Sequence, residues 1–416
     1  MNRKNIFLWT LYDFSNSIVV VVFFLYFSQW LVVDKGVSDF WYNMTFAVGS
    51  VLLLLTAPIL GSIADKTGRQ QKYLNNITAL SFLFFLGASL VALFYSQQIF
   101  LAILFFLMAN YFYQFSFVFY NSLLYCIAPP EKLARVSGIG QAGNWLGQIF
   151  GLLITLPFAT GAIYLFGKAG QTQTFLPATT LFLALALPML LFLKLPQRGN
   201  PSFQIKLKEE YGNQWNQFKE LIKDPNMKYF LIAYFFFNDA IITASNNFPI
   251  YLQNVFGVPD GMKSIVLIGI LITSAIGALL SGWVSDKIGL KKTLAIVIGG
   301  WIIIFPALGL VTSFSLFVTV TIFMGFLFGS IWTVTRAAMT ALTPKEKLNF
   351  GFSFYTLAER VSTFLGPLTW GLITSIFVNL GPTRYRIASI SMAIFVAMGF
   401  YFARKVEFKQ GSEITS

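Results

Sequence analysis

Long apolar runs separated by short polar segments dominate the chain. Twelve such runs lie near residues 6–33, 40–64, 73–95, 98–125, 136–160, 176–195, 227–255, 263–285, 293–312, 315–341, 351–378 and 385–404. An α-helix needs roughly 20 apolar residues to cross a bilayer. Runs such as Ile18 to Leu25 do not alternate in polarity, as the strands of an outer-membrane barrel do. The pattern therefore predicts an all-α integral membrane protein with twelve transmembrane helices.

One long polar stretch, residues 196–226, divides these runs into two sets of six. Its apolar side chains recur at near-helical spacing, at Ile205, Tyr211, Trp215, Phe218 and Leu221. This spacing predicts an amphipathic helix on the membrane surface, and a plain solvated linker is the alternative.

The predicted domains are accordingly two six-helix bundles, a linker between them and a short tail. Their expected bounds are 1–195, 196–226, 227–405 and 406–416.

The composition supports lipid as the main solvent. Hydrophobic residues make up 56% of the chain and charged residues 11%, whereas soluble domains carry about 25% charged residues. So few charges cannot cover a water-facing surface of this size.

The net charge of +13 is explained by topology rather than by nucleic acid. Most Lys and Arg residues lie in loops on one side of the predicted bilayer, as at Lys66, Lys132, Lys287 and Lys345. Cytoplasmic loops carry such an excess. We therefore expect both termini in the cytoplasm, with the protein in the inner membrane of a bacterium.

Few residues offer metal or cofactor chemistry. Cys126 is the single cysteine and the chain has no histidine, so neither a thiolate cluster nor a histidine proton carrier is available. The glycines from Gly138 to Gly143 match a dinucleotide-binding spacing, but no strand precedes them. Gly143, Gly147 and Gly151 instead predict a face for close helix packing. We expect no enzyme, no metal and no cofactor.

The two halves repeat a loop motif. Gly61-Ser-Ile-Ala-Asp65-Lys66-Thr-Gly68-Arg69 follows the second run, and Gly282-Trp-Val-Ser-Asp286-Lys287-Ile-Gly289 follows the eighth. Six-helix repeats of the same orientation are a transporter architecture, with a binding site near the membrane midplane between the repeats.

Both loops resemble the signature loop of the major facilitator superfamily. The resemblance implies the twelve-helix fold of that superfamily and loops that latch the two halves while the outside is open. It implies gating roles for Gly61, Asp65, Gly68, Arg69, Gly282, Asp286 and Gly289.

Other motifs resemble a narrower group, related to the autophagy-linked vacuolar effluxers. They are Tyr12-Asp13-Phe14-Ser15-Asn16-Ser17, Phe119-Tyr120-Asn121-Ser122-Leu123-Leu124 and Val136-Ser137-Gly138-Ile139-Gly140. This resemblance implies efflux of amino acids or similar small solutes.

Ionisable residues inside apolar runs are costly and are seldom without function. Five occur here: Asp13, Asp239, Arg336, Glu359 and Arg360. In the superfamily the first, fourth, seventh and tenth spans line the central cavity. Polar residues concentrate on those spans, at Asp13, Asn16, Gln114, Asn121, Asn238, Asp239, Asn246, Asn247, Trp332 and Arg336.

These residues carry the functional hypothesis. Asp13 and Asp239 would bind a coupling proton, a sodium ion or a cationic substrate group, and Arg336 would hold a carboxylate or pair with an aspartate. Permanent ion pairs between helices are the alternative, and Glu359 with Arg360 favours such a structural or gating pair. The sequence thus predicts a monomeric secondary transporter of a small solute working by alternating access. A membrane receptor or scaffold that kept the fold is the rival interpretation.

Overall fold

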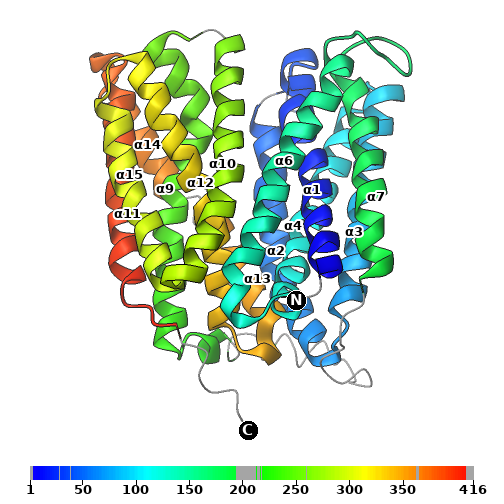
Figure 1. Cartoon of the computed structure of the whole chain (residues 1–416). Helices are drawn as coiled ribbons and strands as arrows, with labels where there is room; N and C mark the ends of the chain where they lie inside the picture. Colours follow the sequence, from blue (N-terminus) through cyan, green and yellow to red (C-terminus); the bar gives the residue numbers. More distant parts are fainter. Residues whose placement is uncertain are drawn as a thin grey trace. The chain divides into compact units, whose positions relative to one another are not determined.

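The computed structural model describes residues 3–27, 29–37, 39–193, 212, 216, 218–258, 260–361 and 365–408. These residues are almost entirely helical (Figure 1). Within them, 11 helices are long and apolar enough to cross a membrane. Their exposed faces carry many large apolar side chains, such as Phe100, Leu153 and Ile303, which suit contact with lipid.

The chain divides into two compact units. Each unit contains most of one half of the sequence and one short segment from the other half. The first unit comprises Met1–Ala128, Gly143–Gln214 and Lys345–Phe354. Its helices are α1 (Arg3–Val22, continued by a π-helical turn at Phe23–Phe27), α2 (Asp39–Thr67), α3 (Gln70–Phe94), α4 (Ile99–Ser122), the short α5 (Leu124–Ile127), α6 (Leu133–Ala159) from Gly143 onward, and α7 (Phe175–Phe192).

The second unit comprises Pro129–Ala142, Trp215–Pro344 and Tyr355–Ser416. Besides the first turns of α6, it contains α9 (Pro225–Phe256), α10 (Asp260–Ile288), α11 (Leu290–Leu310), α12 (Phe314–Leu342), α14 (Leu365–Ile376) and α15 (Thr383–Ala403). Helix α13 (Leu348–Val361) starts in the first unit and ends in the second. The predicted domain bounds stay a prediction.

Eleven of the twelve predicted spans coincide with one long helix each. The run at 351–378 differs, because two shorter helices, α13 and α14, occupy it on either side of residues outside the described part. Most of the predicted amphipathic helix also lies outside the described residues, including Trp215. Its last turn is helical at 218–221, and Leu221 is buried there.

Helix α6 packs against α1 through the predicted glycine face. A Cβ on Gly143 would lie 3.2 Å from the carbonyl oxygen of Thr10, and one on Gly151 would lie 3.0 Å from the Cα of Ile18. A Cβ on Gly147 would overlap the carbonyl oxygen of Phe14. Small residues let helix backbones approach closely where lipid offers no hydrophobic driving force.

Helices α10 and α12 use the same device in the second unit. A Cβ on Gly325 would lie 2.9 Å from the carbonyl oxygen of Ile270, and one on Gly277 would lie 2.6 Å from the Cα of Phe326. The glycines therefore come from both helices of this pair.

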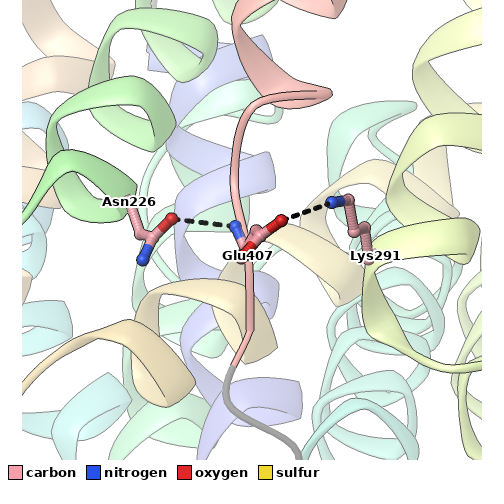
Figure 2. A network of polar contacts seen from close by, with 3 residues as sticks. All are labelled: Asn226, Lys291 and Glu407. Atoms are coloured by element: carbon pink, nitrogen blue, oxygen red, sulfur yellow. Dashed lines mark hydrogen bonds and ion pairs between the residues drawn. The ribbon is translucent and has the colours of Figure 1, made fainter.

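The segment after α15 folds back onto the second unit (Figure 2). The backbone N–H of Glu407 donates to Oδ1 of Asn226 over 2.9 Å, and the Glu407 carboxylate lies 3.8 Å from Nζ of Lys291. Both charged side chains are exposed, so the ion pair contributes little stability. The contacts bring the end of α15 beside the first residues of α9 and α11.

The glycine face of α6 gives a direct prediction. Gly147→Ala should lower the apparent melting temperature in detergent, because overpacking a tight contact costs about 1–3 kcal/mol. Gly371→Ala in α14 is the control, since a Cβ there meets no atom within 4 Å. Equal melting temperatures for the two variants would contradict the packing described.

Candidate functional site

The last turn of α2 holds the start of α13 through Asp65. Oδ1 of Asp65 accepts from the backbone N–H of Asn349 over 3.1 Å and from its Nδ2 over 2.7 Å. Oδ2 accepts from the backbone N–H of Phe350 over 2.9 Å. The first N–H groups of a helix have no partner inside it and carry partial positive charge, so a carboxylate stabilises them. Asn349 is itself buried and accepts from Ser122.

The last turns of α10 carry the corresponding glycine and aspartate, but the carboxylate has a different kind of partner. Oδ2 of Asp286 lies 3.6 Å from a guanidinium nitrogen of Arg135, near the start of α6. Cβ atoms on Gly61 and Gly282 would each lie 2.8 Å from a carbonyl oxygen, that of Asn349 and that of Ala134. Glycine thus permits the same close approach in both units.

A second pair of glycines ends the two helices. Gly68 and Gly289 follow α2 and α10 with φ of 69° and 87°, the left-handed region that favours glycine. Their N–H groups donate to Ala64 and Ser285 over 2.9 and 3.0 Å. Arg69 is exposed, and a gating role for it stays a prediction.

Asp13 lies fully buried in α1 among neutral donors of the first unit. Oδ1 accepts from Nδ2 of Asn144 over 2.8 Å, and Oδ2 accepts from the hydroxyl of Tyr120 over 3.1 Å. The rings of Trp9 and Tyr120 stack 4.6 Å apart, and Trp9 Nε1 donates to the Tyr120 carbonyl. Asp13 therefore joins α1 to α4 and α6.

The other predicted polar residues of the first unit lie on α1 and α4. Asn16 and Asn121 are buried, and Gln114 is half-buried. Sequence reasoning missed Asn144 and Tyr120 as partners of Asp13. Asn144 stands out as a polar residue between two of the packing glycines, which is a signal that could have identified it.

Asn238 and Asp239 in α9 bond the backbones of α13 and α14. Asn238 Nδ2 donates over 3.3 Å to the carbonyl of Glu359 in α13. Oδ2 of Asp239 accepts over 2.6 Å from the backbone N–H of Gly366 in α14. The two neighbouring side chains thus join α9 to both helices.

Arg336 in α12 binds an amide of the same unit. A guanidinium nitrogen donates over 2.6 Å to Oε1 of Gln141, and Arg336 is buried. The neighbouring Thr335 hydroxyl lies 2.9 Å from the hydroxyl of Tyr355, whose ring centre is 4.4 Å from that of Tyr234. Trp332 packs edge-on against Tyr234. Sequence reasoning missed Gln141 and Tyr355.

The remaining predicted residues are less constrained. Asn246 is exposed on α9, and Glu359 is half-buried. The side chain of Arg360 lies outside the described residues, so the proposed pair of Glu359 with Arg360 stays a prediction.

Comparison with known proteins identifies the family. The model of the family described as "Vacuole effluxer Atg22 like" matches residues 36–414. The chain belongs to this family. A protein of Aquifex aeolicus is 25% identical over 96% of both chains. The MFS-type transporter YxiO of Bacillus subtilis is 23% identical over 86% of both chains.

The fold is that of the major facilitator superfamily. The crystal structure of the Escherichia coli fucose:proton symporter FucP matches with a TM-score of 0.73 at 16% identity, covering 98% of this chain and 97% of that one. The predicted fold class and family resemblance are therefore confirmed. The chain is an integral membrane transporter and not an enzyme.

The contact of Asp65 with α13 yields a prediction for this transporter. Asp65→Ala should speed hydrogen–deuterium exchange at Asn349 and Phe350, because loss of a helix cap costs about 0.5–2 kcal/mol. Mass spectrometry of peptides that cover the start of α13 measures this. Asp286→Ala is the control, because its contact lies at α6. Unchanged protection of α13 in the Asp65 variant would show that the carboxylate does not hold this helix.

Proposed function

We propose that this transporter exports an amino acid or a similar small solute by secondary active, alternating-access transport. The description of its family as effluxers supports export. Buried polar side chains lie on α1 and α4 within the first unit and on α9 and α12 within the second, and each set supports binding of a polar solute. The loop charges support both termini in the cytoplasm. The bacterial relatives support a place in a bacterial inner membrane, and we propose that the protein is a monomer there.

The main support for this proposal is that the two carboxylate oxygens of Asp239 have different surroundings. One carboxylate oxygen caps α14, as a purely structural residue would. The other, Oδ1, is buried and has no hydrogen-bond partner among the described residues. A buried carboxylate oxygen without a donor is costly unless a proton or a cation occupies it during part of the cycle. We assign ion coupling to Asp239 on this basis.

Arg336 is the residue that we assign to a carboxylate of the solute. A guanidinium offers five N–H donors in a planar fork that matches a carboxylate. One of these donors binds Oε1 of Gln141, a neutral amide, over 2.6 Å. The aromatic rings of Trp332 and Tyr355 on the same side of the unit favour a small organic solute over a bare inorganic anion.

The test is solute counterflow in proteoliposomes with the purified protein. The panel holds acidic, neutral and basic amino acids, organic acids, sugars and protein-free vesicles as the control. We expect saturable, protein-dependent exchange of at least one solute that bears a carboxylate. Absence of exchange across the whole panel would contradict transport and favour a receptor or scaffold.

The assignment of Arg336 makes a separate prediction. Arg336→Lys should weaken the apparent affinity for the carboxylate solute by about tenfold or more, because hydrogen bonds to charged groups are worth about 1.5–3 kcal/mol. Counterflow at graded solute concentrations measures it.

Arg386→Lys is the matched control. Arg386 donates to the carbonyls of Gly309 and Val311 at the end of α11, so its loss should alter stability but not affinity. Equal affinity in wild type and Arg336→Lys would refute the assignment.

A further inference from the structure

Asp239 and Thr243 present two unsatisfied oxygens on the same face of α9. They are separated by one helical turn, and both side chains are fully buried. Neither Asp239 Oδ1 nor Thr243 Oγ1 has a hydrogen-bond partner among the residues that the structure describes. Most hydroxyls on these helices instead bond a carbonyl of the preceding turn, as Ser245 does with Ile241. Within the described part of the chain, neither oxygen has a donor from α9 or from a neighbouring helix.

Both oxygens face the bare Cα of Gly366. A Cβ at this position would lie 2.8 Å from Asp239 Oδ1 and would overlap Thr243 Oγ1. Glycine at this position therefore lets the backbone of α14 approach both oxygens closely, while its own N–H donates to Oδ2 of Asp239.

The surrounding charges suit a single monovalent cation. Asp239 supplies one negative charge, and divalent cations such as Ca²⁺ take six to eight oxygen ligands with several carboxylates. Beside it, Nδ2 of Asn238 donates to the carbonyl of Glu359 in α13.

We propose that Oδ1 of Asp239 and Oγ1 of Thr243 form a sodium site, with water completing the coordination of the ion. The site rests on the proposed function only for the ion's role in coupling, because binding itself requires no solute. The ion would give the second carboxylate oxygen of Asp239 a positive partner, which the described residues do not provide.

The test is saturable binding of radioactive sodium to the full chain purified in detergent, at constant ionic strength with choline chloride. Wild type should bind sodium, and Thr243→Val, which keeps the shape but removes the hydroxyl, should bind about tenfold more weakly or worse. Thr243→Ser should retain wild-type affinity. Asp239→Asn should bind none, while its amide oxygen can still accept from Gly366.

Ser245→Ala is the matched control, because its hydroxyl is bonded within α9, and its affinity should equal that of wild type. Absence of saturable sodium binding in wild type, or equal affinity in wild type and Thr243→Val, would overturn the site. If Asp239 binds a proton and the protein binds no sodium, the sodium site is wrong and a proton is the ligand. Counterflow can succeed or fail independently, so failure of the site and failure of the proposed function are distinguishable.

Discussion

Lipid offers no hydrogen bonds, so a polar group inside the spanning helices needs a partner from the chain or from a bound ion or water. Three aspartates show how this constraint organises the molecule. Asp13 takes donors from α4 and α6, Asp65 takes the first amides of α13, and Asp239 takes an amide of α14. Each carboxylate thereby fixes one helix to another, and the glycine contacts supply the close approach that these short bonds require.

The two signature loops share their glycines but differ in the strength of their carboxylate contact. Asp65 bonds backbone amides and a buried asparagine, so its partners are fixed by the helix itself. Asp286 faces Arg135 over 3.6 Å, and the Arg135 side chain is 48% exposed. Ion pairs of this kind contribute about 0–1 kcal/mol. The contact in the second unit is therefore the easier of the two to break, which gives the repeat a built-in asymmetry.

Much of the fold follows from the sequence because apolar length is a local property. The span positions, the repeated loops and the glycine face of α6 all rest on residues within one helix or one turn. The run at 351–378 contains α13 and α14, and the residues between these two helices lie outside the described part of the chain.

The partners of the site residues could not be predicted in the same way. The bonds of Asp13 to Asn144 and of Asp239 to Gly366 each join residues more than 100 positions apart. They depend on how each helix is rotated about its axis, which hydrophobic length does not determine. The sequence therefore indicated Asp239 as a candidate site residue. It did not indicate that Oδ2 accepts a hydrogen bond from Gly366 while Oδ1 has no partner among the described residues.

The central claim is that the spare oxygen of Asp239 couples an ion to solute movement. The most direct measurement compares accumulation with exchange in proteoliposomes that contain Asp239→Asn. Asparagine can still cap α14 but carries no charge for a coupling ion. We expect this variant to exchange solute without a gradient but no longer to accumulate solute against one. Accumulation equal to that of wild type would show that Asp239 does not couple an ion to solute movement.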